Sequence, residues 1–144
     1  MTRTSAQIQA SCETTLPQRL AELASDEDRF VRAALVENPQ TPGTLLERLA
    51  SEEKDVVCVK LIKHHHTPIA VLEKFARDRN SRLRAVVAGN ARTPIPILET
   101  LARDEDCHVR IQVAGNPTTP VAILKRLARD ATEIVRVTIV KNRH

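Results

Sequence analysis

The 144-residue chain is poor in aromatic side chains, with two phenylalanines and neither tryptophan nor tyrosine. Aromatic boxes and stacked bases need such rings, so the composition disfavours sites of those kinds. Cysteine is scarce too, and Cys12, Cys58 and Cys107 are an odd number, lie far apart and form no CxxC pair. This pattern argues against a disulfide framework and fits a reducing compartment.

Targeting segments and catalytic motifs are also missing. Neither an apolar h-region at the start nor a run of about 18 apolar residues occurs, so we expect a cytoplasmic protein with no membrane span. The three glycines form no phosphate-binding loop, and GxSxG and HExxH are absent. Cys107 and His108 are adjacent, but sequence neighbours point to different faces and no third group is evident. We therefore expect neither enzyme activity nor a cofactor.

A 26-residue period organises the residues that are present. Thr-Pro recurs at this step, at positions 41–42, 67–68, 93–94 and 119–120. The same step links one leucine of each repeat: Leu20, Leu46, Leu72, Leu98 and Leu124. A fixed period of about 20 to 50 residues indicates stacked supersecondary units that cannot bury their apolar faces alone. We predict an all-α solenoid of about five repeats over residues 13–144, after a partly flexible N-terminal extension over residues 1–12.

Each repeat predicts two short helical segments. Segment B begins at Thr-Pro, where the hydroxyl suits an N-cap and the proline suits the first turn, and it continues through xxxLxxLA. An acidic residue follows and suits the N-terminus of the next segment: Asp26, Glu52, Asp78, Asp104 and Asp130. The acids of SDED and RDED recur with this period, so capping explains them without acid–base catalysis.

Segment A covers the VRxxVAxN stretch and is short enough to be either α-helical or 3₁₀-helical. It ends in a recurring asparagine, a residue that tolerates left-handed φ and bonds nearby backbone. These asparagines are Asn38, Asn90, Asn116 and Asn142. We expect them to have a structural role.

The pattern VRxxVAxNPxTPxxxLxxLAxDxD resembles the leucine-rich repeat variant family. The stretch VRIQVAGNPTTPVAILKRLARD, residues 109–130, matches it almost throughout, and the resemblance extends from about Thr15 to Asn142. It implies a right-handed superhelix with a short α-helix and a 3₁₀-helix per repeat, and it implies no general activity. Some members resemble iron–sulfur proteins because a cysteine-rich segment precedes their repeats. Only Cys12 lies there in this chain, and a cluster needs about four thiolates.

Segment A also carries an arginine series, in which Cys58 replaces the second member. The members are Arg32, Arg84, Arg110 and Arg136. A helical wheel places them between aliphatic positions, where a guanidinium needs a partner, and the acid six residues earlier offers one. We predict a structural ladder of arginine with acid or carbonyl groups, and contact with a ligand such as a run of phosphates is the alternative. The same wheel exposes a strip of variable positions: Ala34, Glu37, Lys60, Lys63, Val86, Gly89, Gln112 and Gly115.

Positive charge is concentrated in the middle repeats. Residues 53–92 contain nine lysines or arginines against four acids. Such an excess attracts acidic proteins, polyanions or anionic surfaces without distinguishing them, and an ordinary mixed-charge surface is the simpler alternative. The stretch KHHHTP lies in the same region, with His64 at the asparagine position and His65 at the position that proline usually occupies. Consecutive histidines cannot all face one ion, so we expect a degenerate turn with a pH-sensitive charge, and the alternatives are adventitious metal binding and a dedicated zinc site.

These features predict a non-catalytic repeat scaffold that binds a protein or peptide partner through the variable strip and the middle repeats. The residues expected to contact the partner are Lys60, Lys63, His64, His65, His66, Arg82 and Arg92. Nonspecific nucleic-acid binding by the same basic patch is the alternative. The last repeat has no following segment B to cover Ile134, Val135, Ile139 and Val140. This predicts self-association through the C-terminal end.

Overall fold

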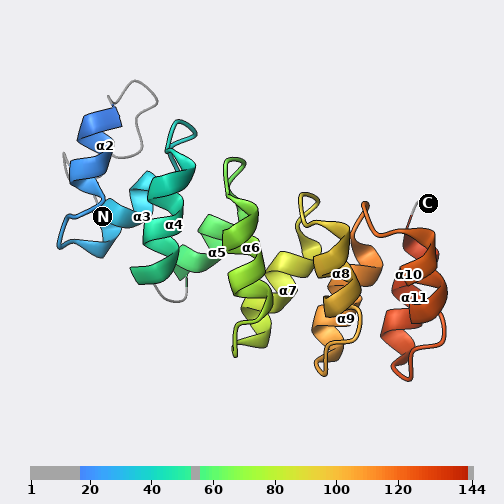
Figure 1. Ribbon diagram of the computed structural model, residues 1–144. Coiled ribbons are helices and arrows are strands. Elements are labelled where there is room, and N and C mark those ends of the chain that lie inside the picture. Colours follow the sequence, from blue (N-terminus) through green and yellow to red (C-terminus); the bar gives the residue numbers. More distant parts are fainter. Residues whose placement is uncertain (1–16, 53–55, 143–144) are drawn as a thin grey trace. The chain divides into compact units, whose positions relative to one another are not determined.

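The secondary structure of the protein is entirely helical over residues 17–52 and 56–142, which are the residues that the computed structural model describes (Figure 1). The ten helices in these ranges are α2 (Pro17–Leu23), α3 (Arg29–Leu35), α4 (Gly43–Glu52), α5 (Val56–Lys63), α6 (Ile69–Ala76), α7 (Ser81–Gly89), α8 (Ile95–Leu101), α9 (Cys107–Gly115), α10 (Val121–Leu127) and α11 (Glu133–Lys141). This confirms the all-α fold class. None of these helices has the length and apolar character that a membrane span requires.

The chain divides into two compact units, residues 1–71 and 72–144, with the boundary inside α6. Unit 1 contains α2 to α5 and the start of α6, and unit 2 contains the rest of α6 and α7 to α11. Even-numbered helices correspond to segment B and odd-numbered helices to segment A. The predicted extension over residues 1–12 lies outside the described residues, and the single array over residues 13–144 stays a prediction.

The core consists of the aliphatic positions that recur with the 26-residue period. The segment B leucine is at most 7% exposed in each described repeat: Leu20, Leu46, Leu72, Leu98 and Leu124. In unit 2, the segment A helices pack against one another, α7 on α9 and α9 on α11, while α8 and α10 contact the segment A helices on either side. Each repeat therefore contributes one helix of each kind to a shared apolar interior.

Segment A is α-helical in every described repeat, with seven to nine residues per helix. This decides between the two conformations predicted for it and differs from the 3₁₀-helix that the family resemblance implied. At α3, α7 and α9, an Asp or Asn N-cap accepts the backbone N–H two residues on, in the pairs Asp28–Phe30, Asn80–Arg82 and Asp106–His108. These caps satisfy free N–H groups and favour a regular α-helical start.

The threonine of Thr-Pro has a different role from the one expected. Its hydroxyl donates to the carbonyl oxygen six residues earlier, in the last turn of segment A, as in Thr93 to Val87 (2.5 Å) and Thr119 to Val113 (2.6 Å). Helices α8 and α10 start directly after their prolines without a side-chain cap. The prediction of a threonine N-cap on segment B was therefore wrong, because the turn directs the threonine hydroxyl to a carbonyl of the preceding helix.

The recurring aspartate lies two residues before the N-cap position that was expected for it. Oδ1 of Asp104 accepts the backbone N–H of Asp106 at 2.9 Å, and it is Asp106 that caps α9. Asp26 and Asp78 make the same bond to the residue two positions on. The aspartate thus shapes the loop through one carboxylate oxygen, which leaves capacity on the carboxylate for another donor.

Candidate partner-binding surfaces

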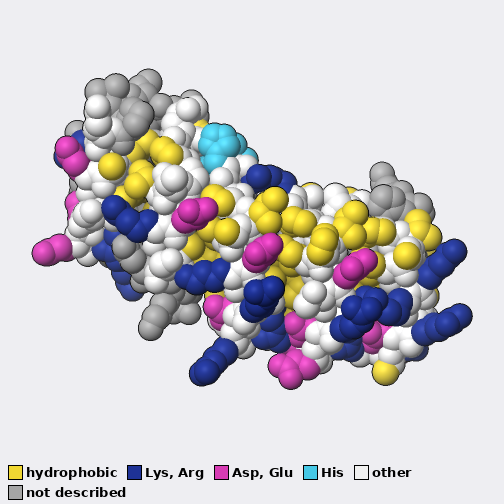
Figure 2. Space-filling view, viewed as in Figure 1, with side chains coloured by type: hydrophobic (Ala, Val, Ile, Leu, Met, Phe, Trp, Pro, Cys, Tyr) yellow, Lys and Arg dark blue, Asp and Glu magenta, His cyan; other side chains and the backbone are white. Residues whose placement is uncertain are grey.

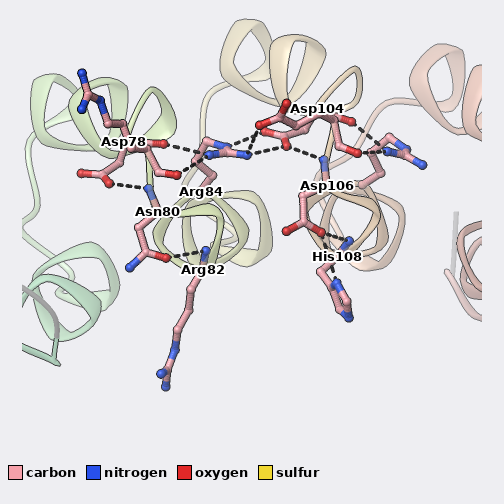
Figure 3. Close-up of polar contacts among 10 residues, drawn as sticks. Asp78, Asn80, Arg82, Arg84, Asp104, Asp106 and His108 are labelled. Atoms are coloured by element: carbon pink, nitrogen blue, oxygen red, sulfur yellow. Dashed lines mark hydrogen bonds and ion pairs between the residues drawn. The ribbon is translucent and has the colours of Figure 1, made fainter.

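Arg84 shows how the arginine series is used (Figure 3). Its Nη1 donates to the carbonyl oxygens of Asp78 at 2.9 Å and Arg79 at 3.1 Å. Its Nε and Nη2 donate to the two carboxylate oxygens of Asp104 at 2.7 and 2.8 Å. The side chains of Arg84 and Asp104 are only 11% and 8% exposed. The guanidinium therefore joins the loop of its own repeat to the acid of the next and has little capacity for a ligand.

Arg110 makes the same contacts 26 residues later. Nη1 donates to the carbonyl oxygens of Asp104 and Glu105, and Nε and Nη2 donate to the Asp130 carboxylate at 2.7 and 3.1 Å. Arg32 and Arg136 also bond the carbonyl six residues earlier, each at 2.6 Å. The acid six positions earlier thus contributes its backbone carbonyl, and the carboxylate comes from the next repeat's member of the same acidic series, twenty positions later. Of the two pairings that the sequence left open, within a repeat or between repeats, Arg84 and Arg110 use the second.

Pairing changes the pKa values of both partners in opposite directions. The hydrogen bond to Asp104 raises the pKa of Arg84 against the opposing effect of burial. Burial disfavours the charged form of Asp104, but hydrogen bonds from Arg84 and the Asp106 N–H outweigh it and lower its pKa. The hydrogen bond from Arg110 likewise lowers the pKa of Asp130. Both pairs are therefore fully ionised at neutral pH.

Asparagines form a second set of connections between repeats. Asn116 is 1% exposed, and its Nδ2 donates to the carbonyl oxygens of Ala88 at 2.6 Å and Asn90 at 2.9 Å, in the preceding repeat. Its Oδ1 accepts the N–H of Thr118 at 2.9 Å. Asn142 repeats both donations one step later, and the Oδ1 atoms of Asn38 and Asn90 accept the N–H two residues on. The amide satisfies carbonyls that a helix end leaves without an intrahelical partner.

His64 takes the place of asparagine chemically as well as in the sequence. It is 7% exposed, its Nδ1 accepts the N–H of His66 at 3.1 Å, and its Nε2 lies 3.0 Å from the carbonyl oxygen of Asn38. Because an N–H points at Nδ1 and a carbonyl only accepts, the ring is neutral with its proton on Nε2. A metal ion on His64 would displace one of these bonds. Burial also makes His64 unsuitable for the partner contact predicted from the sequence.

The other predicted contacts in unit 1 are accessible. His65, His66 and Lys63 are exposed. Lys60 is half-exposed and forms an ion pair with Glu37, and a surface pair of this kind contributes at most about 1 kcal/mol. Lys60 can therefore exchange Glu37 for a partner's carboxylate. Ala34, expected on the exposed strip, is buried at 6%, because its short side chain does not extend past its neighbours into solvent.

Arg82 and Arg92 lie in unit 2, whereas the other predicted contact residues lie in unit 1. Both side chains are exposed. Arg82 is in the first turn of α7, and its side chain extends away from the Arg84 ladder (Figure 3). Arg92 is in the turn after α7, where its N–H bonds Asn90.

A surface on α8 and α10 was not predicted from the sequence. Ile95 and Val121, the first residues of these helices, are 50% and 53% exposed, and Arg103 and Arg129 are exposed just beyond their ends. A signal was present, because arginine precedes the recurring aspartate in the last three repeats, at positions 77, 103 and 129. Serine stands there in the first two repeats, at positions 25 and 51.

One repeat can be compared with a known family. Residues 108–131 match the leucine rich repeat variant model. The match contains most of α9, the Asn116 turn, α10 and Asp130, which together carry one set of the arginine and asparagine contacts. It confirms the resemblance drawn from the sequence in this segment. No curated protein and no solved structure gives a significant match to the chain.

A small cluster of Asp106, Cys107 and His108 lies where the match to the leucine rich repeat variant model begins. Cys107 Sγ lies 3.8 Å and Asp106 Oδ1 lies 3.1 Å from His108 Nδ1. A catalytic triad uses one ring nitrogen for the nucleophile and the other for the acid, whereas both contacts here share Nδ1. Hydrogen bonds from the Ser81 hydroxyl and the His108 N–H lower the pKa of Asp106 to about 2. The carboxylate is engaged as a helix cap, and a metal ion would have to compete with those bonds.

Beyond the leucine rich repeat variant match, α11 exposes apolar side chains. Val140 is 85% exposed and Ile134 is 62% exposed, whereas Val135 is fully buried. The residues at the position of Val140 in the other described repeats are each at most 4% exposed: Val36, Ile62, Ala88 and Ala114. The expected open surface is therefore real for Val140 and wrong for Val135, which packs inward like its counterpart Val109.

Self-association through α11 stays a prediction. We expect the mean mass in sedimentation equilibrium to rise with protein concentration, because association would remove Val140 from water. The rise should be smaller for Val140→Glu. Arg92→Gln is the matched control, because it changes the net charge by the same single unit at an exposed side chain outside α11. A concentration-independent monomer mass for the unmodified chain would exclude the prediction.

Proposed function

We propose that the chain is a non-catalytic cytoplasmic scaffold, a right-handed superhelical solenoid of about five 26-residue repeats that binds a protein partner. One observation carries the proposal: the side chains of the recurring polar residues form hydrogen bonds that join one repeat to the next. Arg84 bonds an acid twenty residues later, and Asn116 bonds a carbonyl 26 residues earlier. Residues that recur are thus needed for stacking, and exposed residues that do not recur are left for recognition.

The proposed contact residues are accessible cationic and histidine side chains that break the repeat pattern. They are Lys60, Lys63, His65 and His66 in unit 1 and Arg82 and Arg92 in unit 2. Their charge suits an acidic protein surface, since complementary potentials favour and orient association. Protein interfaces use such charges around apolar contacts, and the exposed aliphatic residue Ile69 is of the kind they bury.

Nonspecific nucleic-acid binding remains the alternative. It is favoured by the exposed cations Lys63, Arg82 and Arg92. It is disfavoured because Arg84 and Arg110, the recurring cations best spaced to follow a phosphate backbone, are bound to Asp104 and Asp130. The near absence of aromatic rings also removes the platforms that single strands stack on.

Capture from nuclease-treated cell extract tests the scaffold proposal. The immobilised chain should retain a defined protein at about 0.15 M salt, and Lys63→Glu with Arg82→Glu should retain at least tenfold less, because both changes reverse exposed charges. Arg29→Glu with Lys141→Glu, which reverses two other exposed charges, is the matched control with the same change in net charge. Equal capture by the Lys63 and Arg82 variant would contradict the proposed contact residues.

A labelled oligonucleotide separates the two functions. Binding that is strong at low salt and falls steeply toward about 0.15 M would support the nucleic-acid alternative, since phosphate contacts release counterions. No oligonucleotide binding even at low salt, together with protein capture, would leave the scaffold proposal as the explanation.

A further inference from the structure

Helices α8 and α10 present the same order of exposed side chains from start to end. Exposed side chains four residues apart follow one another along each helix and into the turn after it. The series is Ile95 and Glu99 on α8 with Arg103 just beyond its end, and Val121 and Lys125 on α10 with Arg129 just beyond its end; all six are exposed. Each helix therefore runs from an accessible aliphatic residue to an accessible arginine.

The two helices lie side by side in unit 2. Nη2 of Arg126 on α10 donates to the carbonyl oxygen of Glu99 on α8 at 3.3 Å. The aliphatic residues consequently form one row and the arginines a second, parallel row. In Figure 2, hydrophobic side chains gather along one edge of the α8 and α10 region, and Lys and Arg side chains gather along the other.

The arginine row is positive even though each arginine precedes an aspartate in the sequence. The carboxylates of Asp104 and Asp130 turn to Arg84 and Arg110, and their side chains are only 8% and 9% exposed. Arg103 donates at 3.4 Å to the backbone carbonyl of its own helix at position 99. Within the described part of the chain, neither Arg103 nor Arg129 bonds a carboxylate. Glu99 lies four residues before Arg103, but Arg103 bonds its backbone carbonyl and not its carboxylate, so both arginines stay accessible to a partner's carboxylates.

We propose that this face, defined by Ile95, Val121, Arg103 and Arg129, docks an acidic amphipathic segment of a partner protein. Aliphatic side chains of that segment cover Ile95 and Val121, and its carboxylates reach the arginines. Arginine suits this role because its planar fork binds a carboxylate with two hydrogen bonds. A nucleic acid would use the arginines and leave the aliphatic row in water, so the pairing of the two rows favours a protein segment.

The face is restricted to part of the chain. In the first two repeats, Ser25 and Ser51 replace the arginine, and the first position of α4 is Gly43 rather than an aliphatic residue. The repeat architecture alone therefore does not require either row. The proposal rests on the scaffold function and adds a second surface and the chemistry of its partner.

Two designed helical peptides of equal length and equal acidic charge test the proposal, one with two leucines at i and i+4 and one with serines in their place. Binding is followed by fluorescence anisotropy at about 0.15 M salt, with a single-stranded oligonucleotide as a third probe. The leucine peptide should bind at least tenfold more tightly than the serine peptide. Arg103→Glu with Arg129→Glu should weaken it at least tenfold, and Ile95→Ser with Val121→Ser should abolish the difference between the peptides.

Arg29→Glu with Lys141→Glu is the matched control, because it reverses two other exposed charges with the same change in net charge, and it should bind the leucine peptide unchanged. Circular dichroism verifies that all variants stay helical. Equal affinity for the two peptides, binding of the oligonucleotide alone, or unchanged binding by the Arg103 and Arg129 variant would each overturn the proposal. Failure of the peptides together with protein capture that depends on Lys63 and Arg82 would reject this surface and leave the scaffold function standing. Binding of the leucine peptide without protein capture that depends on Lys63 and Arg82 would support this surface and reject the proposed scaffold function.

Discussion

Replacing Asp104 with asparagine should lower the free energy of unfolding by about 3 kcal/mol, because it leaves the Arg84 guanidinium mostly buried without its counter-charge. Asparagine has nearly the shape of aspartate, and its Oδ1 can still accept the Asp106 N–H and Arg84 Nη2, so the loss isolates the negative charge and the bond from Arg84 Nε to Oδ2. Urea unfolding followed by circular dichroism at neutral pH measures the change.

Asp78→Asn is the matched control for this substitution. Asp78 belongs to the same series and makes the same loop bond, to Asn80, but the residue twenty positions before it is Cys58, which has no guanidinium. The control should change stability by less than about 1 kcal/mol. Equal losses at positions 78 and 104 would show that the ion pair with Arg84 is not what stabilises the fold.

Acid provides a second check on the same pair. The folded state lowers the pKa of Asp104 and of Asp130, so their contribution is fully present above the ordinary aspartate value of about 4 and is lost as the pH falls through the lowered values. The unmodified chain should therefore lose more stability below about pH 4 than Asp104→Asn does. A constant difference between the two at all pH values would contradict this linkage.

Replacing Asn116 with leucine should also cost about 3 kcal/mol. The substitution keeps the volume but removes the side-chain donor of the buried Ala88 carbonyl and the acceptor of the Thr118 N–H, while the Asn90 carbonyl keeps only the Thr93 N–H. Thermal or urea unfolding measures the loss. It should exceed that of Thr118→Ala, which removes an exposed side chain and keeps the backbone N–H.

Histidine should be the best tolerated large substitute at position 116, with a loss of about 1 kcal/mol. His64 shows why, because its two ring nitrogens accept the N–H two residues on and donate to the carbonyl 26 residues earlier. Conversely, His64→Asn should keep the stability of the fold and His64→Leu should reduce it. Equal losses for Asn116→His and Asn116→Leu would disprove the equivalence of the two residues.

The repeat pattern predicted much of the local structure, and the reasons can be followed at single positions. Leu98 and its counterparts were predicted to be buried because the 26-residue period and the helical spacing agree on the same face. The register placed His64 at the asparagine position. The role of that position, however, involves a carbonyl one repeat away, so it was visible only once the repeats were stacked.

The candidate binding surfaces were less predictable. Lys63, Arg82 and Arg92 were found from charge alone, and they are exposed. Arg103 and Arg129 were overlooked because each is followed by an aspartate, and the two charges cancel when the sequence is read as a string. Their side chains diverge, since Asp104 and Asp130 turn toward an arginine of the preceding repeat.

The sequence by itself determined the all-helical class, the 26-residue unit and the buried leucines, because these follow from local periodicity and from turn residues within one repeat. Only the tertiary structure decided which acid pairs with which arginine, which asparagine amide bonds which carbonyl, and which cations are left without a bound carboxylate. Those outcomes depend on distances between residues about twenty or more positions apart, which are set when one repeat packs on the next.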